Sequence, residues 1–187
     1  MKILMTGASR GIGMHLSKIL DEHDLTKLDR SDIDLNDTFE TLYFNMDKVE
    51  MLINCAGHNQ GSDKFELMDG EDIVSMLNVN LISPMLLSYK VLSKNPKAKI
   101  VNITSTNIDK PSKNSTVYTT AKTGLSCFTK ALQREGYNSV EARVGLTKTS
   151  KPDSFYEGKS YMNVEEVVYE LYKFIFGHDR YVEIDGK

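Results

Sequence analysis

Two side chains near the middle of the chain have the spacing of an acid–base pair. Tyr118 and Lys122 stand four residues apart, so on a helix they share one face. A free tyrosine has a pKa of about 10, too high for proton exchange near neutral pH, and a neighbouring ammonium lowers that pKa. The spacing indicates a tyrosine that gives or takes a proton, although an ordinary solvated helix turn has the same pattern.

A glycine-rich loop follows the first apolar run. Its sequence is TGASRGIG, and it is followed by apolar residues at helical spacing. A strand, a glycine loop and a helix in this order place backbone N–H groups where the pyrophosphate of a dinucleotide would bind. Three glycines also occur in simple strand-to-helix turns. The residues that we expect at such a phosphate site are Gly7, Ser9, Arg10, Gly11, Ile12 and Gly13.

These motifs and three others occur in the order of the short-chain dehydrogenase/reductase family, which the chain resembles over nearly its whole length. The matching positions are the GxxxGxG loop at Gly7, Gly11 and Gly13, the NNAG-type turn Asn54-Cys55-Ala56-Gly57, Asn80 in a helix, Ser105 thirteen positions before Tyr118, and the Tyr118–Lys122 pair. The resemblance implies that Asn54, Ala56 and Gly57 contact a nicotinamide cofactor.

The resemblance also implies catalytic roles. Tyr118 would exchange a proton with the substrate oxygen, and Ser105 would hydrogen-bond the same oxygen. Lys122 would lower the pKa of Tyr118 and hold the nicotinamide ribose, and Asn80 would order a proton relay. Because Pro84 lacks an N–H, it cannot bond the Asn80 carbonyl four residues earlier, and we expect a kink in the helix there.

The charge around the adenosine ribose bears on cofactor choice. Asp29 could accept hydrogen bonds from both ribose hydroxyls, which favours NAD(H), whereas Arg10, Arg30 and Ser31 could hold a 2′-phosphate. Two arginines against one aspartate favour NADP(H), unless both arginines are only solvated surface charges.

Short apolar runs alternate with segments of helical periodicity along the chain. We expect strands at 2–5, 25–28, 49–53, 100–104, 140–144 and 181–184, and helices at 12–20, 36–46, 71–92, 115–135 and 164–176. Asp37 with Glu40, and Asn163, are expected helix caps. The alternation predicts an α/β fold of Rossmann type, a doubly wound parallel sheet with helices on both faces.

Two stretches are shorter than in the family pattern. The pair Asp34-Leu35 resembles the family's adenine-contacting residues and follows Asp29 so closely that a helix/strand unit after the second strand should be shortened or missing. The segment 143–149 resembles the family's PGxVxT motif with Val144 in place of proline, and implies cofactor contacts from Val144, Gly145 and Thr147. Only about 150–161 is then available for a small substrate lid.

Composition sets further limits. The 187 residues are 40% hydrophobic and 26% charged, and we expect a single NAD(P)-binding domain over 1–187. A net charge of −3 argues against nucleic acid or an anionic membrane as the main partner. Cys55 and Cys127 lack the spacing of a metal or redox site, so we expect buried free thiols and no metal. Without an apolar run long enough to span a bilayer or a signal-peptide pattern, the expected location is cytoplasmic.

Together these observations predict an NAD(P)-dependent oxidoreductase that transfers a hydride between nicotinamide and a small-molecule carbonyl or secondary alcohol, with Tyr118 as the general acid/base. The alternatives are a nucleotide-sugar reductase, which the shortening resembles, and a dinucleotide-binding sensor without turnover. By resemblance, the helices that carry Asn80 and Tyr118 would build a homodimer or homotetramer interface.

Overall fold

A six-stranded parallel sheet forms the centre of the computed structural model, which describes residues 1–60, 64–149 and 153–186. The strand order is β2–β1–β3–β4–β5–β8, and every neighbouring pair is parallel. All the strands therefore end at the same edge of the sheet. Their bounds are β1 Lys2–Thr6, β2 Asp24–Leu28, β3 Met51–Asn54, β4 Lys99–Ser105, β5 Ser139–Val144 and β8 Tyr181–Ile184.

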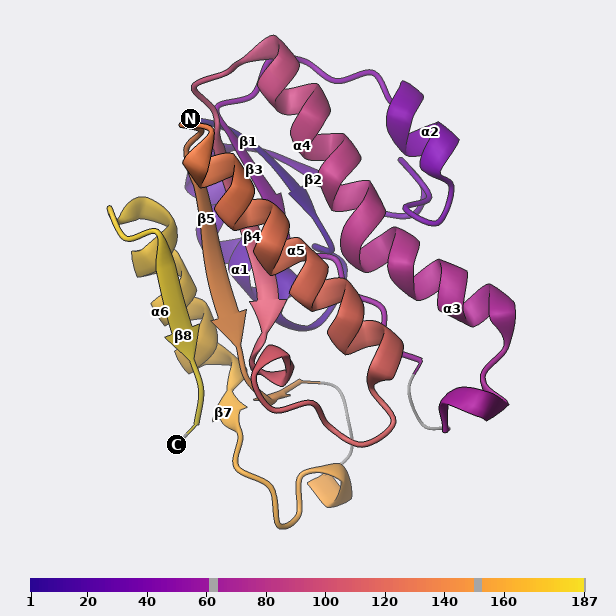
Figure 1. Ribbon diagram of the computed structural model, residues 1–187. Helices are drawn as coiled ribbons and strands as arrows, with labels where there is room; N and C mark the ends of the chain where they lie inside the picture. The colour runs from indigo at the N-terminus through magenta and orange to yellow at the C-terminus, as the bar shows by residue number, and fades with distance from the viewer. Residues whose placement is uncertain (61–63, 150–152, 187) are drawn as a thin grey trace.

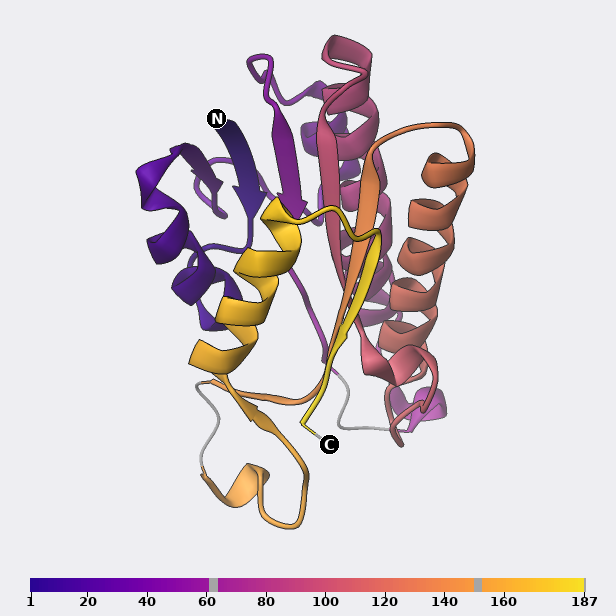
Figure 2. The same cartoon turned by 90° about the vertical axis from the view of Figure 1, so that its left-hand side faces the viewer.

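Helices cover both faces of this sheet, as Figures 1 and 2 show. One face carries α1 (Gly11–Ile19) and α6 (Val164–Phe176), and the other carries α4 (Ser83–Lys94) and α5 (Thr116–Arg134), with α2 (Thr38–Tyr43) beside α4. Helix α3 (Gly70–Leu77) continues into α4 through a π-helical turn at Asn78–Ile82. Short 3₁₀ turns lie at Leu20–Glu22, Phe65–Leu67, Thr106–Ile108 and Asp153–Phe155. The predicted Rossmann-type architecture is confirmed.

Two apolar layers hold the helices to the sheet. Successive residues of a strand point to opposite faces, so Ile3 and Met5 of β1 pack toward α1 and α6, while Leu4 packs toward α4. All three side chains are buried, as a strand covered on both faces requires.

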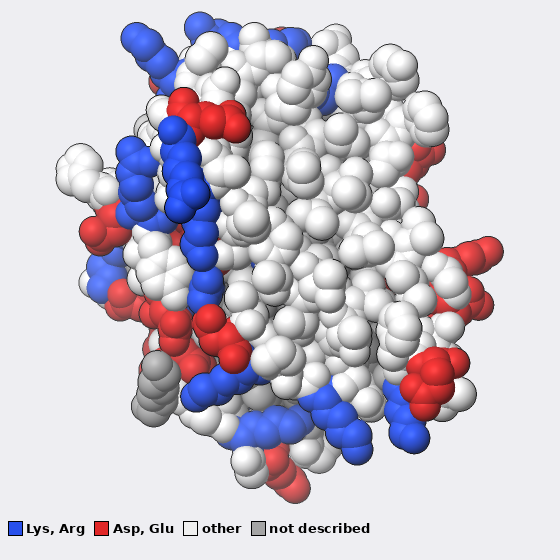
Figure 3. All heavy atoms as spheres, in the orientation of Figure 1, with Lys and Arg blue, Asp and Glu red and all other residues white. Residues whose placement is uncertain are grey.

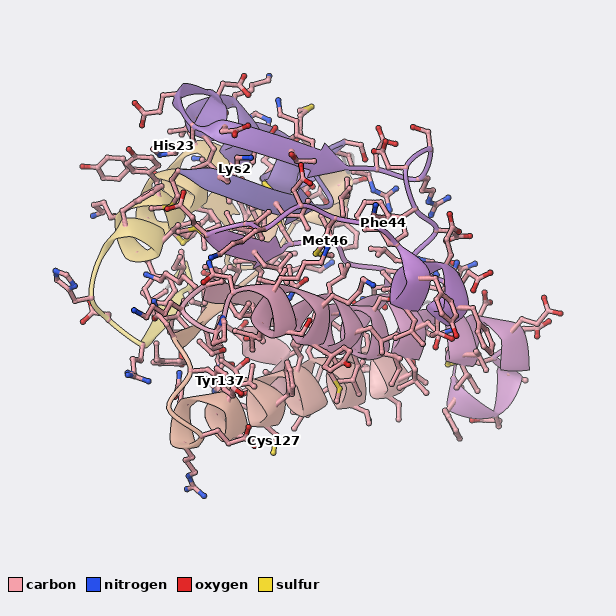
Figure 4. The ribbon with its side chains drawn as sticks, turned by 90° about the horizontal axis from the view of Figure 1, so that it is seen from above. Lys2, His23, Phe44, Met46, Cys127 and Tyr137 are labelled. Carbon is pink, nitrogen blue, oxygen red and sulfur yellow. The ribbon has the colours of Figure 1, made fainter. Side chains whose placement is uncertain are left out.

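The expected helix at 36–46 is shorter than predicted. It ends at Tyr43, and both Phe39 and Tyr43 are exposed although their spacing suggested a buried face. Asp37 caps the helix by accepting hydrogen bonds from the N–H groups of Phe39 and Glu40. Phe44 and Met46 follow in an irregular segment (Figure 4) and supply the apolar contacts instead, packing into the layer that includes α4.

The region after β2 is short, in line with the expectation from Asp29 and Asp34. Strand β2 is the edge of the sheet, and the connection to β3 contains one six-residue helix, α2. The Leu35 carbonyl accepts a hydrogen bond from Ser83 at 2.7 Å, so this connection is fastened to the start of α4.

A second, two-stranded sheet forms the base of the expected lid. Strands β6 (Thr147–Lys148) and β7 (Met162–Asn163) are parallel. Between them, the buried hydroxyl of Tyr156 accepts a hydrogen bond from the Thr149 N–H at 3.0 Å. Asn163 and Glu166 form a capping box that starts α6, as predicted for Asn163. The first three positions of the expected lid, 150–152, lie outside the described residues.

No helix in the described ranges is long and apolar enough to cross a membrane.

Two glycines allow the β1–α1 turn to pack closely. Gly7 has a φ of +74°, and a Cβ there would lie 2.6 Å from the backbone of Ala56, in the turn after β3. A Cβ on Gly13 would lie 2.0 Å from the Gly7 carbonyl oxygen. Side chains are excluded at both positions because the obstructing atoms are backbone.

We expect Gly13→Ala to lower the free energy of unfolding by about 3 kcal/mol or more, because the added methyl group overlaps backbone that cannot move independently. Gly70→Ala is the matched control: no atom lies within 4 Å of its Cβ position at the start of α3, and the change should be neutral or stabilising by up to about 1 kcal/mol. Urea unfolding measures both variants, and equal stability of the two would contradict the close packing.

Candidate active site

A cleft of about 1040 Å³ runs along the edge where the strands end. Ligands of parallel α/β sheets bind at this edge, because loops from several strands meet there. The predicted site residues that line the cleft are Gly7, Ser9, Arg10, Gly11, Ile12, Gly13, Asp29, Arg30, Asp34, Leu35, Ala56, Gly57, Ser105, Tyr118, Lys122, Val144, Gly145 and Thr147.

Three predicted residues are absent from the described lining and have structural roles instead. Asn54 is buried and donates a hydrogen bond to Asn102 at 2.8 Å, linking β3 to β4. Ser31 donates to Asp29 at 2.6 Å. Asn80 is fully buried, and its amide pairs with the backbone N–H and carbonyl of His58, at 3.2 and 2.6 Å. Neither Ser31 nor Asn54 lines the cleft, so their cofactor contacts stay a prediction from the sequence.

The region of Asn80 and Pro84 is irregular, as predicted. The chain makes a π turn there, in which the Ser83 N–H bonds the carbonyl of Asn78. From this turn, the Asn80 amide hydrogen-bonds the backbone of His58, in the loop that follows β3. Asn80 thus positions His58, which lines the cleft.

The phosphate end of the cleft lies at the N-terminus of α1. The close approach of Gly7 and Gly13 leaves room above the helix, and backbone N–H groups there lack helical partners. The guanidinium of Arg10, at the N-cap position, is exposed. This cradle, which side chains at the glycines would fill, fits a pyrophosphate.

Ser105, Tyr118 and Lys122 meet at the other end of the cleft. Burial raises the pKa of the Tyr118 hydroxyl, and a hydrogen bond with Ser105 acts in the opposite direction. The Lys122 ammonium lies 5.9 Å from the centre of the Tyr118 ring and donates to the Ile103 carbonyl at 2.9 Å. Burial lowers the pKa of Lys122 to about 8, so the ammonium is the main form at pH 7.

The expected lowering of the Tyr118 pKa by Lys122 is not found in this structure. The ammonium points to the backbone of β4, and desolvation of the tyrosine outweighs the other effects. Tyr118 is consequently protonated at neutral pH, which suits a proton donor. Burial also raises the pKa of the neighbouring Cys55 thiol to about 11, so it is not a reactive thiolate.

A buried polar network holds the loop that begins at Ser105. Glu141 of β5 accepts hydrogen bonds from Thr104 at 2.8 Å and from Ser126 of α5 at 2.9 Å. Arg143 pairs with Glu141 at 3.0 Å and with Asp109, which follows Ser105. The network links the strand before Ser105, the loop after it and the helix that carries Tyr118, and so fixes their relative position.

The adenosine end carries the groups that decide between cofactors. One Asp29 oxygen accepts from both the N–H and the hydroxyl of Ser31, which lowers the Asp29 pKa. Arg10 and Arg30 are exposed and line the cleft, and no carboxylate among the described residues pairs with either guanidinium.

The cleft extends beyond Tyr118 to residues that the sequence motifs did not reveal. They come from loops that follow strand ends: His58 and Asn59 after β3, Asn107, Ser112, Lys113 and Asn114 after β4, and Phe155 and Lys159 in the lid. Their position after a strand was the available signal, since it places them at the same edge of the sheet as the motifs.

Known sequences of one family resemble this chain. A profile of the family described as short chain dehydrogenase matches residues 26–150. A bovine 3-oxoacyl-[acyl-carrier-protein] reductase is 33% identical over 105 residues, which cover 54% of this chain and 44% of the relative. An NADP-dependent 3-hydroxy acid dehydrogenase of Schizosaccharomyces pombe is 29% identical over 161 residues, 75% of this chain and 62% of the relative. The chain thus spans less than two thirds of these curated relatives.

Solved structures share the fold at low identity. A 4-hydroxyisoleucine dehydrogenase complexed with NADH has a TM-score of 0.83 at 20% identity, covering 100% of this chain and 98% of that one. A short-chain dehydrogenase of Burkholderia cenocepacia in complex with NADP has a TM-score of 0.81 at 20% identity, covering 99% and 96%. With the family profile matched over most of the chain and its motifs gathered in one cleft, this protein belongs to the short-chain dehydrogenase family.

Proposed function

We propose that this chain is an NAD(P)-dependent oxidoreductase that reduces a small-molecule carbonyl or oxidises the corresponding alcohol. The observation that carries the proposal is the meeting of Ser105, Tyr118 and Lys122 at the end of a cleft whose other end is a phosphate cradle. Residues 1–187 would act as one nucleotide-binding unit, with the segment around Tyr156 as the substrate lid. We also propose a cytoplasmic location.

The proposed mechanism assigns proton handling to the protein. A bound nicotinamide dinucleotide supplies the hydride that reaches the carbonyl carbon. Tyr118, protonated at neutral pH, gives its proton to the carbonyl oxygen, and Ser105 hydrogen-bonds that oxygen as negative charge develops. Lys122, freed from the Ile103 carbonyl, would hold the nicotinamide ribose. In the oxidative direction Tyr118 takes the proton instead.

For the cofactor we propose NADP(H) over NAD(H). Arg10 and Arg30 line the cleft without a carboxylate partner among the described residues, whereas one oxygen of the Asp29 carboxylate already accepts two hydrogen bonds from Ser31. Two free guanidiniums favour a 2′-phosphate, which each could bind through paired hydrogen bonds.

Tyr118→Phe should reduce kcat at least about 1,000-fold, because only the proton donor is lost. Cofactor affinity, measured by nicotinamide fluorescence, should change less than about twofold. If the Tyr118→Phe variant turned over near the wild-type rate, the mechanism would be contradicted. If the wild-type protein bound the cofactor but showed no turnover, the sensor alternative would be favoured.

Arg30→Ala should weaken NADPH binding about tenfold and leave NADH binding nearly unchanged, since only NADPH carries the 2′-phosphate. Lys97→Ala, a change to another exposed cation away from the cleft, controls for net charge. Titration of each variant with both cofactors makes the comparison, and equal losses for NADPH and NADH would rule out this role of Arg30.

We also propose that the chain forms a homodimer or homotetramer through α4 and α5. Figure 3 shows a broad area without charged side chains over α4 and the adjoining side of α5, with charges gathered around its rim. Met85 and Tyr89 of α4 are exposed. Cys127 of α5 points away from the body of the molecule (Figure 4), so its expected burial was wrong for the isolated chain. Burial of an uncharged face between subunits would explain this composition.

Tyr89→Glu should shift the protein to monomers in sedimentation equilibrium, because a carboxylate would be buried in the apolar contact. Tyr169→Glu is the matched control, since Tyr169 is similarly exposed on α6, on the opposite face of the sheet. A wild-type protein that sediments as a monomer, or a Tyr89 variant that sediments like the wild type, would contradict the proposed interface.

A further inference from the structure

The substrate end of the cleft is polar and carries unpaired positive charge. Lys113 reaches it from the loop between β4 and α5, and Lys159 reaches it from the lid, so two separate segments each provide an ammonium. Neither lysine has a carboxylate within ion-pair distance in the described ranges. This arrangement contrasts with the net charge of −3 of the whole chain.

The acidic residues of the same two segments do not neutralise these lysines. Asp109 is paired with Arg143, and Asp153 is paired with Lys148 at 2.7 Å. Glu157 is exposed and is not part of the described cleft lining. The carboxylates that do line the described cleft, Asp29 and Asp34, belong to its adenosine end. The substrate end therefore keeps a local positive charge.

The Lys159 ammonium is held by its own segment, and hydrogen bonds brace the loop that carries Lys113. Lys159 donates to the Phe155 carbonyl at 2.6 Å and lies 3.8 Å from the centre of the Phe155 ring, which also lines the cleft. An ammonium has three N–H donors, so two remain for a ligand. On the other side, Ser112 bonds Asn107 at 3.0 Å and Ser115 bonds the Ser112 carbonyl at 2.6 Å, which braces the loop at Lys113.

We infer that the substrate is anionic: a small oxo acid, or its hydroxy acid, whose carboxylate is bound by Lys113 and Lys159 while its carbonyl faces Ser105 and Tyr118. This inference rests on the proposed oxidoreductase function and names its substrate class. The amide and hydroxyl groups of Asn107 and Ser112 give the rest of the pocket a polar lining that suits a short, hydrated substrate better than a long apolar one.

The test compares oxo acids of four to six carbons with their methyl esters, which keep the carbonyl and the carbon skeleton but lose the charge. The rate at which the reduced cofactor is oxidised gives kcat and KM for each acid and for each ester. The acid should have a kcat/KM at least about tenfold higher than its ester, and this advantage should shrink as salt is raised, because the lysines are exposed.

Lys113→Gln and Lys159→Gln should each raise the KM for the acid about tenfold and leave both kcat and the ester kinetics nearly unchanged. Lys110→Gln is the matched control, because Lys110 is exposed on the same loop as Lys113 but does not line the cleft.

The outcomes separate this inference from the function on which it rests. The anionic substrate would be overturned if esters or neutral ketones had the same kcat/KM as the acids. It would also be overturned if neither lysine substitution changed the KM for the acid. Either result would leave the oxidoreductase function in place. A cofactor-bound protein that reduces no acid, ester, ketone or aldehyde in the panel would instead overturn the oxidoreductase, and the substrate class with it.

Discussion

The site depends on one constraint, that all six strands of the sheet are parallel and end at one edge. The loops after β1, β3, β4 and β5 must converge there, although they are far apart in sequence. Two of them touch without intervening side chains, because the turn at Gly7 lies against the backbone of Ala56. A phosphate cradle and a proton donor can then occupy a single cleft without any extra element to bring them together.

Buried polar groups give this edge its shape. Asn54 and Asn102 link β3 to β4, and Glu141 with Arg143 links β4, β5 and α5. Each bond would be lost if a strand slipped in register, and an unpaired buried charge is strongly destabilising. The same desolvation acts on the reactive groups, since burial keeps Tyr118 protonated and brings the pKa of Lys122 down to about 8.

The sequence predicted the features that depend on local residue patterns. It did not predict the features that depend on contacts between distant segments. The parallel fold followed from periodicity, and the motifs around Gly7, Ser105 and Tyr118 led to about half of the residues that line the cleft. Phe39 and Tyr43 have the spacing of a buried helix face, yet α2 is too short to bury them, and Met46 fills the core from an irregular segment. Asn54 was expected to contact the cofactor and Asn80 to order a proton relay; in the structure Asn54 donates to the Asn102 side chain, and Asn80 bonds the His58 backbone. Lys113 and Lys159 belong to no motif, and only the fold shows that both line the same cleft.

The most direct test of this account is a titration of the purified chain with NADPH in the absence of substrate, in which nicotinamide fluorescence reports binding. If the shortened side of the sheet beyond β2 still completes a dinucleotide site, the signal should saturate at one cofactor per chain and should be lost in Gly13→Ala even where that variant remains folded. Saturable binding with this dependence is the predicted result. Failure of both NADPH and NADH to bind would contradict the central claim that this cleft holds a nicotinamide dinucleotide.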